Sequence, residues 1–302
     1  MTGFKCGFIA LIGEPNAGKS TLLNRMVGAK VSIVTHKVQT TRARIRGIAL
    51  LDNAQMVFVD TPGLFRPRRN LDRAMVKAAW SGAADADLVV LLVEAHRGTT
   101  EGVKAILEAL KERVGKRPIA LAINKIDKVK ADKLLALSTE LNNLFPFEAT
   151  FMISAEKGHG TDDLKKWLAG ELPSGPWLYD EDQIADIPTR MLAAEITREK
   201  LTLRLHQEIP YQLTVETEHW QDRKDGSVRI DQIIYVMRDG HKGITLGPKG
   251  ETIKAVSMAA RQELKEFLGR EVHLFLQVKV RPKWLNEPER YTEMGLDFKD
   301  SK

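Results

Sequence analysis

The sequence lacks the features of secreted and membrane-spanning proteins. Among 302 residues there is one cysteine, Cys6, so no internal disulfide can form and a reducing cytosol is the expected setting. The longest apolar run, 88–93, has the length of a strand and is too short to cross a bilayer. The first residues do not show a charged segment followed by an apolar one, as a secretion signal would. We expect a cytoplasmic protein, with peripheral association at the inner membrane left open.

What the chain does contain is typical of a globular protein with room for two domains. Hydrophobic residues make up 43% and charged residues 28% of the sequence, and 302 residues allow two cores of ordinary size. The net charge of +6 favours polyanionic partners only mildly. Cys6 lies in an apolar strand-like segment, where we expect it to be a small buried side chain.

Strand-like and helix-like segments alternate through the first half of the chain. A short polar spacer at 52–54 predicts an antiparallel hairpin at the sheet edge. The alternation predicts an α/β fold, with a mostly parallel six-stranded sheet covered by helices on both faces. The expected strands are 7–12, 43–51, 55–59, 88–93, 119–123 and 150–153, and the expected helices are 20–27, 101–114, 130–144 and 162–172.

The pattern changes after a proline- and glycine-containing stretch at 173–176 and an acidic segment that we interpret as a linker. Beyond it we expect a small α+β domain with helices at 189–205 and 251–268 and strands at 211–220, 227–238 and 271–280. The predicted organisation is therefore a first domain at 1–175, a linker at 176–188 and a second domain at 189–302.

A phosphate-binding loop is predicted between the first strand and the first helix. The segment fits GxxxxGK[ST], and the strand-to-helix context makes a chance glycine-rich turn a poor alternative. Backbone N–H groups and the helix N-terminus can bind phosphate oxygens. Lys19 can reach the β- and γ-phosphates, and the Ser20 hydroxyl can ligate Mg²⁺. The residues concerned are Gly13, Glu14, Pro15, Asn16, Ala17, Gly18, Lys19, Ser20 and the following Thr21.

Three more motifs follow strands on the same edge of the predicted sheet. Asp60 can hold Mg²⁺ through water and the Gly63 N–H can sense the γ-phosphate, although such a tetrapeptide alone is commonly an ordinary turn. Asp127 can accept hydrogen bonds from guanine N1–H and N2, which adenine cannot offer, so it selects GTP over ATP. The three segments are Asp60, Thr61, Pro62 and Gly63; Asn124, Lys125, Ile126 and Asp127; and Ser154, Ala155 and Glu156.

The four motifs in this order resemble the GTPases of the translation-factor class. Within that class Gln39-Thr40-Thr41-Arg42 is similar to the switch I segment of the Era family. The resemblance implies that Thr41, or alternatively Thr40, ligates Mg²⁺ together with Ser20 and Asp60. It also implies that Lys19, Thr41 and Gly63 are the catalytic residues. Without the family, a solvated loop threonine is an equally good interpretation.

One residue departs from the pattern of Ras-type enzymes. Leu64 follows the Asp-x-x-Gly segment where those enzymes carry a water-orienting glutamine, so we expect slow intrinsic hydrolysis. The water must then be placed by backbone, a partner or a cation. Some relatives bind K⁺ at the position of Asn16, which otherwise only stabilises the loop. Arginines at 66, 68 and 69 could act as internal arginine fingers or meet RNA, but a solvated basic loop fits them better.

In the second half, Gly247-Pro248-Lys249-Gly250 is a GxxG loop followed by a long helix. This arrangement is that of a KH domain, whose loop clamps about four nucleotides. A turn between two helices is the alternative. Basic and acidic residues nearly balance after residue 181, but nine basic residues oppose four acidic ones within 241–283. The expected RNA-binding residues are Lys242, Gly247, Pro248, Lys249, Gly250 and Lys254.

Together, a GTPase domain, a linker and a C-terminal type II KH domain make nearly the whole chain resemble the Era family. Members of this family bind the 3′ end of 16S ribosomal RNA and assist 30S subunit maturation. The resemblance implies that this chain also binds GTP, GDP, 16S ribosomal RNA and the 30S subunit, and that it is a monomer. Two other hypotheses stay open. One is a tRNA-modifying or trafficking GTPase whose second domain binds protein, and the other is an RNA-binding protein with an inert nucleotide domain.

Overall fold

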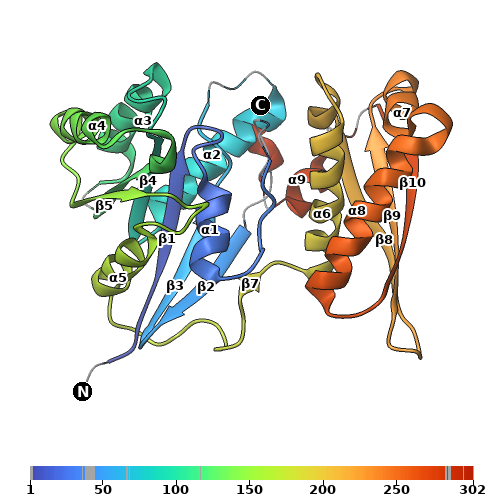
Figure 1. Cartoon of the computed structure of the whole chain (residues 1–302), viewed down its shortest axis with the longest axis horizontal. Coiled ribbons are helices and arrows are strands. Elements are labelled where there is room, and N and C mark those ends of the chain that lie inside the picture. Colours follow the sequence, from blue (N-terminus) through green and yellow to red (C-terminus); the bar gives the residue numbers. More distant parts are fainter. Residues whose placement is uncertain are drawn as a thin grey trace. The chain divides into compact units, whose positions relative to one another are not determined.

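The computed structural model describes residues 3–35, 37, 45–65, 67, 69–115, 117–282, 284, 287–294 and 296–301. The predicted switch I residues 39–42, including Thr40 and Thr41, lie outside this part of the chain, as do the arginines at 66 and 68. Two compact units are present (Figure 1). The first comprises Met1–Ser32, Thr41–Asp186 and Tyr291–Lys302, and the second comprises Ile33–Thr40 and Ile187–Arg290.

Within the described residues, the first unit contains a seven-stranded sheet in the order β6-β5-β4-β1-β3-β2-β7. β2 pairs antiparallel with β3 and with β7, and the other pairs are parallel. The predicted α/β fold and its antiparallel hairpin are thus confirmed. The strands are β1 (Lys5–Gly13), β2 (Ile45–Leu51), β3 (Ala54–Asp60), β4 (Leu88–Glu94), β5 (Ile119–Asn124), β6 (Ala149–Ile153) and β7 (Ala185–Asp186).

The seventh strand was not predicted from the sequence. β7 has only two residues, both in the segment interpreted as a linker, and pairs with Arg46 and Gly47. Two residues are too few to show the alternation that marks a strand. Because β7 lies outside β2, the hairpin does not form the edge of the sheet as expected.

Helices cover both faces of this sheet. α2, α3 and α4 share one hydrophobic core with side chains of β1, β4 and β5 such as Ile12, Leu91 and Ile123, whereas α1 and α5 contact β2 and β3. α2 was not predicted, because alanines supply much of its buried face and give a weak periodic signal. The helices are α1 (Lys19–Val27), α2 (Asn70–Asp85), α3 (Glu101–Arg113), α4 (Ala131–Leu144) and α5 (Thr161–Glu171), with a 3-10 turn at Ile126–Lys128.

Gln55 in β3 fixes the start of the predicted linker. Its side chain is fully buried and accepts hydrogen bonds at Oε1 from the backbone N–H groups of Leu178 (2.8 Å) and Tyr179 (3.1 Å). Gln55 Nε2 donates to the carbonyl oxygen of Tyr179 at 2.8 Å. Since each of these buried polar groups has a partner, this part of the linker belongs to the packed first unit.

The second unit is the expected α+β domain. Its sheet has the order β10-β9-β8, with β8 and β9 antiparallel and β9 and β10 parallel. Its core joins helix residues such as Ile196 and Leu264 to strand residues such as Ile230. The elements are α6 (Thr189–Arg204), β8 (Leu213–Asp222), β9 (Val228–Val236), α7 (Asp239–Leu246), α8 (Glu251–Leu268) and β10 (Val272–Val280), with 3-10 turns at Ile209–Tyr211 and Pro248–Gly250.

Other elements add to what the sequence predicted. α9 (Pro288–Glu293) and a 3-10 turn at Phe298–Ser301 follow the second sheet, where no element was expected. No described helix combines the length and the apolar character needed to span a membrane. In the second unit, Lys37 Nζ donates to the carbonyl oxygen of Thr202 at 2.5 Å and thereby satisfies an unpaired carbonyl in the last turn of α6.

Candidate functional site

The predicted phosphate loop lies between β1 and α1, as the motif requires. Gly18 has φ of +100°, and Asn124 Nδ2 occupies the place where a Cβ on Gly18 would lie. Only glycine fits that combination of backbone angle and close neighbour. α1 begins at the next residue, Lys19, so the helix N-terminus, which favours a bound anion, directly follows the loop.

Lys19 is a buried cation, with 6% of its surface exposed. Its Nζ donates to the carbonyl oxygens of Gly13 (3.1 Å) and Glu14 (3.0 Å). Burial lowers the pKa of Lys19 to about 8, although the negative charges of Asp60, Glu14 and Glu94 oppose this shift. A bound phosphate would supply the counter-charge that favours the protonated amine.

Two hydroxyl groups meet the fully buried carboxylate of Asp60 at the end of β3. Ser20 Oγ donates to Asp60 Oδ2 at 2.7 Å and Ser32 Oγ donates to the same oxygen at 2.9 Å. A hydroxyl and a carboxylate oxygen this close are the ligand types that Mg²⁺ prefers, so these residues fit that ion. Ser32 was not among the predicted site residues, because no motif covers it.

The segment after Asp60 packs tightly against the phosphate loop. A Cβ on Gly63 would lie 2.9 Å from Pro15 Cα, so the backbone of Gly63 directly faces the loop. Thr61 Oγ1 donates to the carbonyl oxygen of Leu11 at 2.7 Å and is therefore engaged in the fold. Leu64 is 5% exposed and belongs to the hydrophobic core. An apolar, buried side chain cannot orient an attacking water.

Asn124 connects three loops of the site. Its Nδ2 donates to the carbonyl oxygen of Ala17 at 2.8 Å, and its Oδ1 accepts from the backbone N–H groups of Lys125 (2.8 Å) and Ala155 (3.0 Å). The phosphate loop and two base-pocket loops are thus fixed to one buried amide. This role is structural, whereas the sequence predicted only that Asn124 is part of the nucleotide site.

Asp127 presents an exposed carboxylate in the predicted base pocket. Ser154 Oγ donates to Asp127 Oδ1 at 2.6 Å, and this hydrogen bond is the main cause of a lowered pKa for Asp127. Asp127 is therefore ionised at neutral pH and can accept from the two donors of guanine. The Ala155 N–H is already bonded to Asn124, so it contributes to the shape of the pocket.

Two residues that the sequence did not indicate support the phosphate loop. Oε2 of Glu94, at the end of β4, lies 2.6 Å from Nζ of Lys125. Thr100 Oγ1 donates to Glu14 Oε2 at 2.8 Å. Both belong to no known short motif, and only an alignment of many relatives could have drawn attention to them.

The GxxG loop of the second unit connects α7 to α8. Gly247 has φ of +74° and ψ of 173°, and Thr252 Oγ1 occupies the place of a Cβ on Gly247. Lys249 has φ of +49° and stands in the left-handed region at the centre of the loop. Among the described residues, Lys242, Lys249 and Lys254 form no ion pair with a carboxylate, so all three amines are available to a phosphate backbone.

Comparison with known proteins agrees with this geometry. A family model described as "50S ribosome-binding GTPase" matches residues 8–125, and a KH domain model matches residues 208–285. The chain is 76% identical over 297 residues to GTPase Era of Dinoroseobacter shibae, which covers 98% of this chain and 96% of that protein.

Two solved structures match across both units. Era in complex with MgGDPNP and nucleotides 1506–1542 of 16S ribosomal RNA has a TM-score of 0.90 at 37% identity, covering 97% of this chain and 99% of that one. An Aquifex aeolicus Era variant bound to GDP·AlF4⁻ has a TM-score of 0.91 at 37% identity with the same coverage. With its four nucleotide motifs and its GxxG loop in place, the chain belongs to the Era family of GTPases, with an N-terminal GTPase domain and a C-terminal KH domain.

Proposed function

We propose that the protein is a GTP-hydrolysing switch that binds the 3′ end of 16S ribosomal RNA and assists assembly of the 30S subunit. The observation that carries this proposal is the presence, in one chain, of a guanine-nucleotide site and a KH loop whose lysines form no ion pair with any described residue. A relative with the same two domains binds MgGDPNP and that region of RNA. In the sequence we place the two domains at 1–175 and 189–302, although the first compact unit also takes in the linker up to Asp186 and Tyr291–Lys302. We expect a cytoplasmic monomer.

In the GTPase domain, Lys19 and the N–H groups of residues 13–20 bind the phosphates, and Asp127 selects guanine. Ser20, Asp60 and Thr41 are the residues that would hold Mg²⁺, which neutralises phosphate charge when it is bound. The Gly63 N–H reports the presence of the γ-phosphate, since its backbone faces the phosphate loop. These residues bind and orient the phosphates.

Hydrolysis is expected to be slow, because Leu64 is buried and apolar. Asn16 lies in the phosphate loop with φ of +67° and is our candidate for a K⁺ ligand. GTP turnover should fall when K⁺ is replaced by Na⁺ at equal ionic strength, and unchanged turnover would remove K⁺ from the proposal. Replacing Asn16 by Asp or Ala in K⁺ and Na⁺ shows whether this residue carries the difference.

RNA binding is coupled to the nucleotide by a shift between two populations. GTP orders the switch segments and favours an RNA-competent state, and hydrolysis ends it. By linkage, RNA must then bind more tightly to the GTP-analogue form than to the GDP form. Equal affinities would leave two independent binding activities in one chain.

The direct test uses the full chain and an RNA spanning nucleotides 1506–1542 of 16S ribosomal RNA, the segment that the relative binds. We expect binding that Gly247→Ala abolishes, because Thr252 leaves no space for a methyl group there. Gly269→Ala, at the C-terminal end of α8 and outside the GxxG loop, is the matched control: its φ is +64° and no atom lies within 4 Å of an added Cβ. It should lower the free energy of unfolding by about 1 kcal/mol through backbone strain and leave RNA binding intact.

The rival functions give different outcomes. If the full chain binds no RNA in either nucleotide state, a second domain that binds protein becomes the better interpretation. If RNA binding is unaffected by nucleotide and Lys19→Ala leaves GTP turnover unchanged, the nucleotide domain is inert. The buried amine of Lys19, held by two carbonyl oxygens of the phosphate loop, favours an active one.

A further inference from the structure

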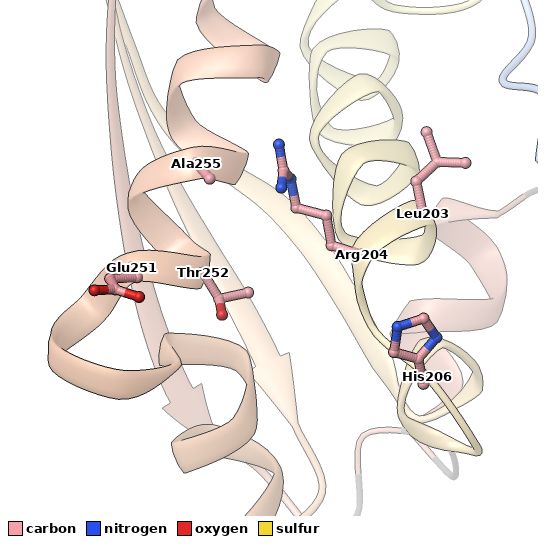
Figure 2. Close-up of a pocket in the computed structure, with 6 residues that line it drawn as sticks. All are labelled: Leu203, Arg204, His206, Glu251, Thr252 and Ala255. Atoms are coloured by element: carbon pink, nitrogen blue, oxygen red, sulfur yellow. The ribbon is translucent and has the colours of Figure 1, made fainter.

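The second unit contains a pocket of about 490 Å³ between α6 and α8 (Figure 2). Its lining includes one arginine, Arg204, and one glutamate, Glu251, so their opposite charges balance and the pocket selects neither an anion nor a cation. Contacts that favour a particular ligand lie instead in the first unit, around the loop that follows β6.

Arg25 reaches this loop from the last turn of α1, at the surface of the first unit. Its Nε donates to the carbonyl oxygen of Ala155 at 3.2 Å, and its Nη2 donates to the carbonyl oxygen of Glu156 at 2.6 Å. The guanidinium also packs over Gly158, where an added Cβ would lie 3.6 Å from Arg25 Cζ. One side chain of α1 therefore holds the base loop, residues 154–158.

The two hydrogen bonds fix the peptide groups on either side of Glu156. A trans peptide is planar, so its N–H points in the direction opposite to its C=O. Because the carbonyl of Ala155 faces Arg25, the N–H of Glu156 in the same peptide points away from α1. Without the guanidinium, no described donor would hold that peptide in this orientation.

The N–H of Glu156 is the donor that the base loop keeps available for a ligand. Among the described residues it has no hydrogen-bond partner. The other N–H groups of the loop are bonded within the first unit: Ser154 to the carbonyl oxygen of His159 (2.9 Å), Ala155 to Asn124 Oδ1 (3.0 Å), Lys157 to Ser154 Oγ (3.2 Å) and Gly158 to the carbonyl oxygen of Ser154 (2.7 Å).

We propose that Arg25 is a positioning residue for guanine recognition, acting through the Glu156 N–H that it orients. Guanine presents two donors, N1–H and the N2 amino group, and one acceptor, O6. Asp127 accepts from the donors, and the Glu156 N–H donates to O6. Adenine carries an amino group at C6, so two donors would face each other and an oriented N–H disfavours that base. This inference rests on the proposed role of Asp127 and adds the other half of the base contact.

The experiment measures the affinity of the full chain for GDP, IDP (inosine diphosphate) and ADP by competition against a fluorescent guanine nucleotide. The base of IDP keeps O6 and N1–H but lacks the N2 amino group, so the ratio of GDP to IDP affinity reports on Asp127. Arg25→Met keeps the length of the side chain without its donors. It should weaken GDP and IDP by the same factor, about tenfold for lost hydrogen bonds to a charged group, and should not weaken ADP.

Two further variants separate positioning from a general structural role. Arg25→Lys keeps a charged donor and should restore most of the lost GDP affinity. Arg113→Met is the matched control, since Arg113 is also an exposed arginine in the last turn of a helix, α3, and packs over the ring of Trp80. It loses the same favourable interaction with a helix dipole and should change none of the three affinities. Thermal unfolding of each variant checks that the first unit is intact.

The outcomes distinguish this proposal from the one on which it rests. Equal losses for GDP and ADP would show that Arg25 supports the fold and not the base contact. Unchanged GDP affinity in Arg25→Met, or no recovery in Arg25→Lys, would contradict a donor role. A changed ratio of GDP to IDP affinity would place the effect at Asp127. If the wild-type chain binds ADP as tightly as GDP, guanine selection by Asp127 is itself wrong and the Arg25 proposal fails with it.

Discussion

Glu94 and Lys125 form an ion pair across the carboxyl ends of the neighbouring strands β4 and β5, with Lys125 Nζ 2.6 Å from Glu94 Oε2. Lys125 Nζ also donates to the carbonyl oxygen of Asn16 at 2.7 Å. Glu94 is 7% exposed, so the pair is shielded from solvent. One amine therefore joins the guanine loop to the phosphate loop, and Glu94 determines where that amine lies.

We predict that Glu94→Gln weakens binding of GDP and GTP about tenfold, equivalent to about 1.4 kcal/mol. The amide keeps the shape of the side chain but removes the charge that orients Lys125, and hydrogen bonds to charged groups contribute about this much. Affinity can be measured by titration with a fluorescent guanine nucleotide. Glu101→Gln, which removes an exposed partner of Lys104 at 2.9 Å, is the control and should have no effect. Equal affinities for the wild type and Glu94→Gln would refute the positioning role.

The buried amine of Lys19 makes nucleotide binding dependent on pH. Its pKa of about 8 lies below the ordinary value of 10.5, so in the nucleotide-free protein Lys19 loses its proton as pH rises through about 8. Phosphate binding favours the protonated amine, so affinity should fall above pH 8 by up to tenfold per pH unit. Between about pH 8 and pH 10.5 the amine of Lys19 is protonated in the unfolded chain and largely unprotonated in the folded one. The contribution of Lys19 to the free energy of unfolding therefore rises with pH across this range.

Calorimetry in buffers of different ionisation enthalpy measures the proton uptake directly. We expect uptake of a proton on GDP binding at a pH above about 8 and none well below it. Proton uptake that does not vary across this range would show that Lys19 is already fully protonated without nucleotide.

Ser154 is predicted to keep Asp127 ionised into the acid range. Its hydroxyl hydrogen bond is the largest cause of the lowered pKa of Asp127. Ser154→Ala should raise that pKa toward the ordinary value of 3.8. In the wild type, Asp127 loses its charge only when pH falls through its lowered pKa. In the variant the carboxylate is protonated at a higher pH, so guanine affinity should begin to fall at a higher pH than in the wild type. The pKa can be followed by carboxyl ¹³C NMR, and identical titrations would contradict the prediction.

Gln55 should stabilise the first unit through the linker. Gln55→Ala leaves the backbone N–H groups of Leu178 and Tyr179 and the carbonyl of Tyr179 without the partners they have here. We expect the free energy of unfolding to fall by about 1–3 kcal/mol. We also expect the amides of Leu178 and Tyr179 to exchange faster with deuterium. Asn143→Ala, at an exposed position of α4 and without a side-chain hydrogen bond to any described residue, is the control and should stay within about 0.5 kcal/mol of the wild type.

Much of this protein could be predicted from sequence because its function depends on short segments. The phosphate loop, the Asp60 segment and the Asn124 segment each follow a run of apolar residues that forms a buried strand. Apolar runs form strands because they are buried on both faces of a sheet, and glycines allow the tight turns after them because their backbone is free to adopt positive φ. Both effects act locally, so they can be predicted from the sequence. The α/β fold, the α+β second unit and the place of the GxxG loop before a long helix followed in the same way.

The remaining features depend on contacts between residues far apart in the chain, and no local pattern encodes them. Ser32 and Asp60 meet 28 residues apart, and Asn124 reaches Ala17 across 107. Gln55 holds the linker across more than 120 residues. Packing of the sheet and helices brings these partners together, because a buried polar group must find a partner wherever the fold places one. The sequence by itself therefore determined which chemistry the chain carries, and only the tertiary structure decided which residues hold that chemistry in position.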